Sequence, residues 1–351
     1  MDQKTASPSQ DHDQDRIRRG PTIAEIAREA HLGTATVDRV LNGRSSVREV
    51  TRLKVLSALE RLQRPHVVVT GPTARRIAFL CDSGVSFNTT LQAAVSGYVA
   101  DHQGIECPFF SVATSRVDPI KLANTIERTA AEADALVIVA REDLMINRAI
   151  RNVVARKVPV VCLTTDLPAS GRQAYVGSDA TAAGSTAAYL MSQVIGERDG
   201  KILLVYSAPY RAQDEREMGF RRILRSECPK LIVNERVNSN DDPEYVYRNV
   251  VRYIEEHGEP AGIYNVAGGN SGIGKAIGEF GLAGKLVFIG HELNANSRHL
   301  LETGVMNFAI GHDVAQEVAA AIRHAIALSE QKPQPPLAPT PVRIYTKFSC
   351  N

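Results

Sequence analysis

Residues 22–62 contain three short stretches in which apolar residues recur at helical spacing. The first opens with the capping-box pattern T-x-x-E at residues 22–25 and ends near His31, where a break containing Gly33 leads into the second. The third extends to about Leu62. The expected inward positions are Ile23, Ile26, Ala27 and Ala30, then Thr36, Val37, Val40 and Leu41, then Val50, Leu53, Leu56 and Leu59. Two short helices about a tight turn, backed by a third, predict an all-α helix-turn-helix domain over residues 21–63.

Beyond this domain the pattern changes to short apolar runs that alternate with helical stretches. The runs lie at residues 77–81, 135–140, 158–163, 201–206, 262–266 and 285–289. Continuous apolar runs are typical of parallel strands that are buried on both faces, and alternation with helices indicates doubly wound sheets. The length of the region predicts an α/β domain of two similar lobes over residues 76–345. Residues 1–20 are then a disordered tail, 64–75 a linker and 346–351 a short carboxyl-terminal tail.

Positive charge is concentrated near the amino terminus. Residues 16–64 carry eleven Lys and Arg against five Asp and Glu, a balance of +6, whereas the whole chain of 351 residues carries only +2. Such asymmetry is expected where one end of a protein meets a polyanion such as DNA. On charge alone, a solvated basic face is the alternative interpretation.

Cysteine usage and hydropathy exclude several classes of protein. Cys81, Cys107, Cys162, Cys228 and Cys350 are odd in number and form no C-x-x-C pair, which favours free thiols in a reducing compartment over disulfides or a metal site. The first 15 residues lack the apolar core of a signal peptide, and no apolar run approaches membrane-spanning length. We therefore expect a cytoplasmic protein with no membrane partner, no metal and no cofactor.

The segment TIAEIAREAHLGTATVDRVLNGRSSVREVTRLKVLSALERL, residues 22–62, resembles the DNA-binding domain of the lac repressor family, and T-V-x-R-V-L-N is its most specific part. The resemblance implies base contacts and phosphate contacts with double-stranded operator DNA. Arg39 is the strongest base contact, because its planar guanidinium can address O6 and N7 of guanine together. Asp38, unusual in the family, either holds Arg39 in register or accepts a bond from cytosine. The implied base contacts are Thr34, Ala35 and Arg39, and the phosphate contacts are Thr22, Thr36, Asn42 and Thr51.

The predicted linker departs from the family pattern. Members usually carry a hinge helix whose leucine wedges into the minor groove, whereas here Pro65, the three valines at 67–69 and Gly71-Pro72 disfavour a helix. We expect an extended tether and less bending of the operator than a wedging member would produce.

Polar residues gather directly after the predicted strands, at the edge where ligands bind in open α/β sheets. Carboxylates and amides around an aromatic ring suit a polyhydroxyl ligand, although any one of these residues alone is as readily part of an ordinary polar loop. The region is similar to the periplasmic sugar-binding fold that serves the lac repressor family as its effector module. That resemblance implies a cleft containing Arg216 and Glu292, with Asp166 and His312 as companions. The expected effector-binding residues are Asp82, Phe87, Asn88, Thr164, Asp166, Arg216, Asn265, Asn270, Glu292 and His312.

The combined features predict a homodimeric, sequence-specific transcriptional repressor of a carbohydrate uptake or catabolic operon, controlled by a sugar, polyol or sugar phosphate. The segment PVRIYTKFSCN, residues 341–351, resembles the closing strand of the family, and no leucine heptad follows it, which argues against a tetramer. A solute-binding or sensor protein without operator-specific repression is one alternative, which the basic amino-terminal domain disfavours. A nicotinamide-dependent enzyme is another, suggested by the glycine-rich run at 267–274, but that run lies too late in the chain. His291-Glu292 lacks the second histidine of a zinc protease motif.

Overall fold

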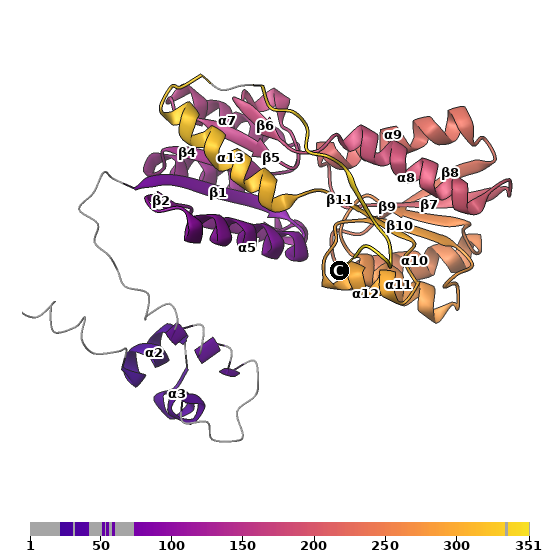
Figure 1. Ribbon diagram of the computed structural model, residues 1–351, viewed down its shortest axis with the longest axis horizontal. Coiled ribbons are helices and arrows are strands. Elements are labelled where there is room, and N and C mark those ends of the chain that lie inside the picture. The colour runs from indigo at the N-terminus through magenta and orange to yellow at the C-terminus, as the bar shows by residue number, and fades with distance from the viewer. Residues whose placement is uncertain are drawn as a thin grey trace, which may run out of the picture. The chain divides into compact units, whose positions relative to one another are not determined.

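The computed structural model describes residues 22–30, 32–41, 51–52, 54–55, 58–59, 74–333 and 336–350. The chain divides into two compact units, Met1–Gly71 and Pro72–Asn351, shown in Figure 1. The predicted amino-terminal tail and most of the predicted linker lie outside the described residues, and the first strand begins at Arg75.

The smaller unit contains helices α2 (Ile23–Ala30) and α3 (Thr34–Leu41). The predicted capping box is confirmed, because the Thr22 backbone N–H donates to Glu25 Oε2 at 2.9 Å and the Glu25 N–H donates to Thr22 Oγ1 at 3.3 Å. Contrary to the prediction, Ile23 and Leu41 are exposed. The buried cluster consists of Ile26, Ala27, Ala30, Val37, Val55 and Ala58, with Leu32, Val40 and Leu59 packed against it. The described residues between 51 and 59 are helical, and the expected inward residues Val50, Leu53 and Leu56 lie outside the described residues.

Lobe 1 of the larger unit is a parallel sheet covered by helices on both faces. Its strands are β1 (Arg75–Ser83), β2 (Ile105–Glu106), β3 (Phe109–Ala113), β4 (Ala135–Val139), β5 (Val160–Leu163) and β6 (Ala174–Val176), in the order β2-β1-β4-β5-β6 with β3 also paired to β1. Its helices are α5 (Val85–Asp101), α6 (Pro119–Thr129), α7 (Leu144–Ala155) and α13 (Val314–Ser329). Side chains of β1 alternate as a strand requires: Phe79 packs with α5 and α13, and Leu80 packs with α6 and α7.

Lobe 2 is also a six-stranded sheet covered by helices on both faces, and it differs from lobe 1 in having one antiparallel strand. Its strands are β7 (Gly200–Tyr206), β8 (Leu231–Asn238), β9 (Gly262–Asn265), β10 (Val287–His291), β11 (Phe308–Gly311) and β12 (Arg343–Tyr345), in the order β12-β11-β10-β9-β7-β8, and only the β11–β12 pair is antiparallel. Its helices are α8 (Ala180–Ile195), α9 (Arg211–Glu227), α10 (Pro243–His257), α11 (Asn270–Glu279) and α12 (Ala295–Glu302). Helices α8 and α9 cover one face, and α10, α11 and α12 cover the other. Short 3₁₀ turns occur in lobe 1 at Thr114–Arg116, Ala130–Glu132 and Pro168–Ser170.

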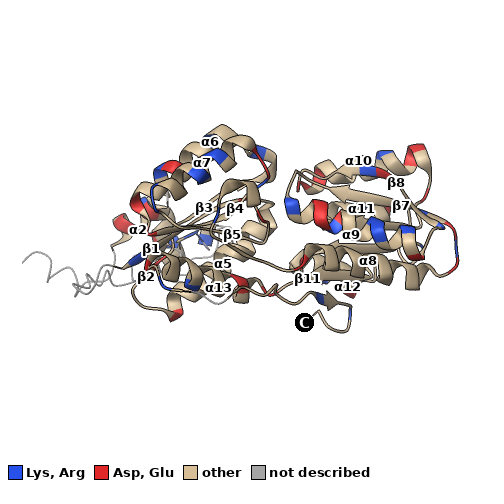
Figure 2. Cartoon of the chain, turned by 90° about the horizontal axis from the view of Figure 1, so that it is seen from above, with Lys and Arg blue, Asp and Glu red and all other residues tan. Residues whose placement is uncertain are grey.

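The predicted fold class is confirmed, and all six predicted strands are present as β1, β4, β5, β7, β9 and β10. The closing strand that the family resemblance implied is also present, as β12. Strands β2, β3, β6, β8 and β11 were not predicted, because they are short or carry exposed and charged positions that interrupt an apolar run. In Figure 2 the charged residues of both lobes, coloured blue and red, lie mainly on helices and loops.

The chain passes between the lobes three times, at residues 177–179, 312–313 and 330–342, which we call the crossover segments. Helix α13 packs on lobe 1 although the strands before and after it, β11 and β12, belong to lobe 2 (Figure 1). The first and third crossover segments are bridged, because Thr340 N–H donates to Gly177 O at 2.9 Å. None of the described helices is long and apolar enough to cross a membrane.

Candidate functional site

A cavity of about 470 Å³ lies between the two lobes of the larger unit. Its walls include the segments that follow four strands: 83–87 after β1, 164–165 after β5, 266–271 after β9 and 291–294 after β10. These are the carboxyl ends of parallel strands, where open α/β sheets bind their ligands. The volume lies within the usual range of small-molecule sites.

Six of the ten predicted effector-binding residues line this cavity: Phe87, Thr164, Arg216, Asn270, Glu292 and His312. Asn270 lines it with a satisfied side chain, because its amide donates to His291 O at 3.0 Å and its oxygen accepts from Asn265 at 2.7 Å. The open polar groups are therefore fewer than the sequence predicted.

The other four predicted residues are not among the described residues that line the cavity, because neighbouring groups hold each of them. Asp82 accepts two bonds from the Arg141 guanidinium, at 2.6 and 2.9 Å. Asp166 forms an ion pair with Arg172 at 2.6 Å. The remaining two are amides bonded to loops: Asn88 donates to Ser83 O at 2.9 Å, and Asn265 donates to Gly268 O at 3.2 Å.

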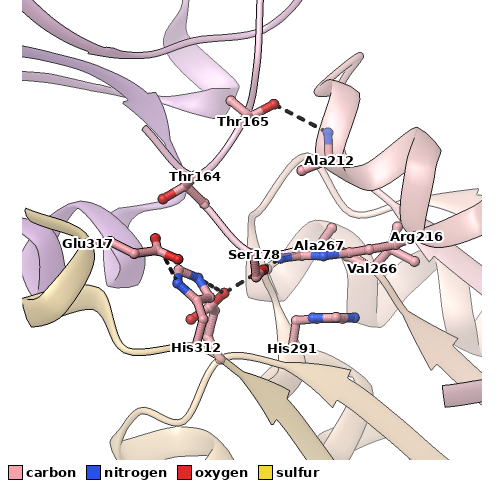
Figure 3. Close-up of polar contacts among 12 residues, drawn as sticks. Thr164, Thr165, Ser178, Ala212, Arg216, Val266, Ala267, His291, His312 and Glu317 are labelled. Carbon is pink, nitrogen blue, oxygen red and sulfur yellow. Dashed lines mark hydrogen bonds and ion pairs between the residues drawn. The ribbon is translucent and has the colours of Figure 1, made fainter. Parts of the chain in front are cut away.

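Four charged side chains form a cluster at the cavity, partly shown in Figure 3. The Arg216 Nη2 atom on α9 lies 3.8 Å from Glu292 Oε1, which follows β10. His312, in the second crossover segment, places Nε2 3.2 Å from the same oxygen and Nδ1 2.9 Å from Oε2 of Glu317 on α13. Glu317 also accepts a bond from the Thr340 hydroxyl of the third crossover segment.

The charges of this cluster are set by mutual contact. Burial alone would lower the pKa of His312, but Glu292 and Glu317 outweigh it and raise that pKa to about 10. Burial would raise the pKa of Glu292, but His312 and Arg216 hold it below its usual value. His291 lies beside the cluster, and its burial together with the positive charges of Arg216 and His312 holds its pKa well below the usual value, so it is neutral. At neutral pH the cluster thus holds two positive charges, on Arg216 and His312, and two negative charges, on Glu292 and Glu317.

Two buried polar atoms at the cavity have no partner among the described residues. They are Arg216 Nε and Thr164 Oγ1. Arg216 is only 8% exposed, so water has little access to its Nε–H and cannot readily take the place of a missing acceptor. A buried donor without a partner is costly, and a ligand oxygen at each position would relieve that cost.

Thr164 and Glu292 also share an uncommon backbone conformation. Their φ angles are 63° and 68°, in the left-handed region that residues other than glycine rarely adopt. They occupy equivalent places in the two lobes: Thr164 N–H donates to Val176 O at the end of β6, and Glu292 N–H donates to Ile310 O on β11. Strained residues of this kind cluster at ligand sites, which agrees with their place in the cavity wall.

Helix α9 carries Arg216 into the cavity because α8 packs against its backbone. A Cβ atom on Gly184 of α8 would lie 1.8 Å from the Arg216 carbonyl oxygen, and one on Gly219 of α9 would lie 2.2 Å from the Thr181 carbonyl oxygen. Only glycine permits so close an approach of two helices.

A second set of polar contacts, which the sequence did not predict, joins the lobes at the cavity wall. Thr114 Oγ1 of lobe 1 lies 2.6 Å from Asp241 Oδ2 and 3.0 Å from Tyr210 Oη, both of lobe 2. Tyr210 also donates to Asp82 Oδ1 of lobe 1 at 2.6 Å. The Glu142 N–H of lobe 1 donates to Pro209 O at 2.8 Å. We call these interlobe contacts the latch. Tyr210 follows strand β7 as other site residues follow theirs, which was the one sequence signal that pointed to it.

A further interlobe contact lies beside the latch: Ala212 N–H of α9 donates to the Thr165 hydroxyl of lobe 1 at 3.3 Å (Figure 3). The N-cap residue Tyr210 makes no side-chain capping bond to the first turn of α9. A side chain from the opposite lobe, that of Thr165, instead satisfies the second N–H of the helix.

In the smaller unit, the predicted base-contacting residues share an exposed face of α3. Thr34, Ala35 and Arg39 are exposed, whereas Thr36 and Asp38 are half-buried. Of the other residues implied to contact DNA, Thr22 is exposed at the start of α2, Thr51 is half-buried, and Asn42 lies outside the described residues.

Comparison with known proteins matches both units. Residues 77–333 match the family described as periplasmic binding protein domain, and residues 22–63 match that of bacterial regulatory proteins, lacI family. Catabolite control protein A of Streptococcus mutans is 46% identical over 56 residues, 16% of this chain and 17% of that protein. The match thus spans about one sixth of that relative's length.

Solved structures similar to this chain cover its larger unit. A glucose-galactose binding protein from Geobacillus stearothermophilus has a TM-score of 0.72 at 16% identity, over 79% of this chain and 99% of its own. An ABC transporter solute binding protein from Agrobacterium vitis with bound D-fucose has a TM-score of 0.72 at 21% identity, over 78% and 96%. At these identities the likeness shows a shared fold. The chain therefore belongs to the family described as periplasmic binding protein domain, and its amino-terminal unit carries the DNA-binding domain of bacterial regulatory proteins, lacI family.

Proposed function

We propose that the protein is a sequence-specific DNA-binding transcriptional regulator, a repressor, whose affinity for operator DNA responds to an uncharged sugar in the interlobe cavity. The observation that carries the proposal is the charge-balanced cluster of Arg216, His312, Glu292 and Glu317 at the cavity, located in the same chain as the exposed face of α3. A carboxylate accepts from sugar hydroxyls and a guanidinium donates to them, so both kinds of partner are present.

The charge balance selects among the ligands that the sequence left open. A sugar phosphate would add roughly two negative charges to a cluster in which Glu292 and Glu317 already neutralise Arg216 and His312. Asp242 lines the same cavity, and its carboxylate opposes an anion further. A neutral sugar or polyol leaves the ion pairs intact. The related structures support this choice, because one is a glucose-galactose binding protein and another holds D-fucose.

On DNA, the protein acts as a homodimer in the cytoplasm and regulates a carbohydrate uptake or catabolic operon. One helix-turn-helix unit covers few base pairs, and the two-fold symmetry of a dimer matches a palindromic operator. Closure of the two lobes around the sugar changes the dimer geometry and so the affinity for DNA. The family matches favour such a binding role over catalysis.

Thermal unfolding of the purified full-length protein tests the ligand class. We would compare D-glucose, D-galactose, D-fucose and a series of pentoses and polyols with glucose 6-phosphate. A ligand at about 100 times its Kd adds about 2.7 kcal/mol to the folded state, so one neutral sugar should raise the midpoint by several degrees. Stabilisation by the phosphate alone, or by no sugar in the series, would contradict the proposal.

A further inference from the structure

The latch contains a chain of four oxygen atoms that alternates between the lobes. Asp241 Oδ2 of lobe 2 lies 2.6 Å from Thr114 Oγ1 of lobe 1, which lies 3.0 Å from Tyr210 Oη of lobe 2, which lies 2.6 Å from Asp82 Oδ1 of lobe 1. Each of the three contacts therefore crosses the cleft. Opening of the lobes must break all three together.

Three oxygen–oxygen contacts of hydrogen-bond length require three protons. The hydroxyls of Thr114 and Tyr210 supply two, because each hydroxyl carries a single donor. The third proton must therefore lie on one of the two carboxyl groups that end the chain. Without it, one contact would place two lone pairs against each other inside the protein.

The surroundings of the two carboxyls decide which one holds the proton. Asp82 is fully buried and accepts two bonds from the Arg141 guanidinium, an arrangement that requires the ionised form. The bonding partners of Asp241 are neutral: the Thr114 hydroxyl, the Gly268 N–H at 2.6 Å and the Ser207 hydroxyl. No cation is among these partners, and burial away from a cation favours the protonated form of a carboxyl.

We propose that Asp241 carries a proton when the lobes are closed and donates it to Thr114, so that closing the cleft takes up one proton. Asp241 is the first donor of a continuous chain that runs through Thr114 and Tyr210 to the carboxylate of Asp82. Opening returns Asp241 to water, where it ionises and releases the proton. The regulator thus closes more readily as the pH falls.

The charged groups around Asp241 agree with this assignment. Burial is the largest influence and raises the pKa of Asp241, the negative charge of Asp82 adds to the rise, and the bond that Asp241 accepts from the Gly268 N–H opposes it. Arg141 is the cation on the lobe 1 side, and it is engaged by Asp82 and by Thr114 O at 2.9 Å. On the lobe 2 side, Asp242 is a second acid in the same loop, bonded to the Tyr245 N–H at the start of α10.

The loop that carries Asp241 is held in a strained form. Asn240 and Asp241 have φ angles of 49° and 51°, two consecutive residues in the left-handed region. At Gly84, where α5 begins, a Cβ atom would lie 3.0 Å from Asp241 Cβ, so the glycine makes room for the loop. Strain of this kind persists only where surrounding contacts hold it, and the latch supplies them.

The sign of the pH dependence follows from the two states. In the open form Asp241 has the ordinary pKa of about 3.9, and in the closed form a higher one. The closed-to-open ratio is therefore greatest below the lower pKa. It falls by up to about tenfold per pH unit as the pH rises between the two values, and it is constant above the higher one.

Amide hydrogen exchange of Glu142 in the full-length protein, without sugar or DNA, measures this ratio directly. Its N–H donates across the cleft to Pro209 O, so opening exposes it to solvent. After correction for the intrinsic exchange rate, we expect its protection in the wild type to fall as the pH rises above the ordinary pKa of an aspartate, about 3.9. Asp241→Asn places an N–H donor where the acid proton lies, so its protection should be independent of pH and exceed that of the wild type at pH 8.

Asp199→Asn, at an exposed position, is the matched control and should keep the wild-type slope. Thr114→Val interrupts the chain by another route and should lose both the slope and most of the protection. A flat wild-type profile, or an unchanged slope in Asp241→Asn, would overturn the proposal. Because no sugar is present, these outcomes are independent of whether the proposed ligand class is right.

Discussion

Gly184 on helix α8 offers a direct test of how the packing of lobe 2 positions the ligand site. Its substitution by alanine would place a Cβ atom 1.8 Å from the carbonyl oxygen of Arg216, where an ordinary contact is at least 3.4 Å. That oxygen belongs to the backbone of α9 and cannot rotate away, so the two helices must separate by more than an ångström. Overpacking of this kind costs typically about 1–3 kcal/mol, and the rigid neighbour favours the upper end.

Urea unfolding of the purified Gly184→Ala protein measures this cost. With a slope of about 2–3 kcal/mol per molar urea, a loss of 3 kcal/mol lowers the midpoint by about 1 M. Movement of α9 also withdraws Arg216 from Glu292, so the affinity for the sugar identified by thermal unfolding should fall as well.

Gly97→Ala is the matched control, because Gly97 lies inside helix α5 and a Cβ there would meet no atom within 4 Å. Alanine has the higher helix propensity, so this protein should gain up to about 1 kcal/mol. The same Gly→Ala change should therefore lower the free energy of unfolding at position 184 and raise it at position 97. A Gly184→Ala protein as stable as the wild type would refute the claim that α8 and α9 meet at their backbones.

Four other substitutions test separate parts of the structure. Tyr210→Phe removes the hydrogen bond to the buried Asp82 carboxylate, and such a bond contributes about 1.5–3 kcal/mol. The exchange protection of the Glu142 amide should therefore fall by about 10- to 150-fold. Unchanged protection would exclude Tyr210 from the latch. Two carboxylates raise the pKa of His312 to about 10, against the effect of burial, so the stability that its charge contributes is complete below pH 6.5 and is lost as the pH rises towards 10. His312→Gln should flatten this part of the profile of stability against pH. A variant with the same slope as the wild type would contradict the ion-pair assignment. Glu292→Ala should abolish the sugar response while leaving DNA affinity intact, and an unchanged response in a sugar titration would remove it from the site. Arg39→Ala should cost about 1–3 kcal/mol in operator binding and relax specificity at one base pair, and wild-type discrimination among operator variants would refute its role.

The sequence predicted the fold well because the strands that organise it are continuous apolar runs. The runs that became β4 and β5 are buried at every position, so their pattern was unambiguous. Strand β8 was missed because Asn234, Glu235 and Arg236 interrupt its apolar residues at a sheet edge. An edge strand buries less of its surface, so its composition carries a weaker signal.

The candidate site was predicted in part, and the errors have a common cause. Position after a strand places a residue near the cleft but does not show what its side chain bonds to. Asp166 was expected to meet the ligand, but Arg172, six residues later, holds both of its carboxylate oxygens. Thr114, Tyr210 and Asp241 come together only through the folding of both lobes, so no local pattern could have linked them.

The central claim is that one chain couples sugar binding in the cleft to DNA binding by α3. The most direct measurement is fluorescence anisotropy of a palindromic duplex, selected by the full-length protein from random sequences, at fixed salt with and without the sugar found by thermal unfolding. The account predicts that saturating sugar weakens the affinity for the duplex by about 5- to 150-fold, the usual size of an allosteric coupling. Identical binding curves with and without sugar, at a sugar concentration that stabilises the protein, would contradict it.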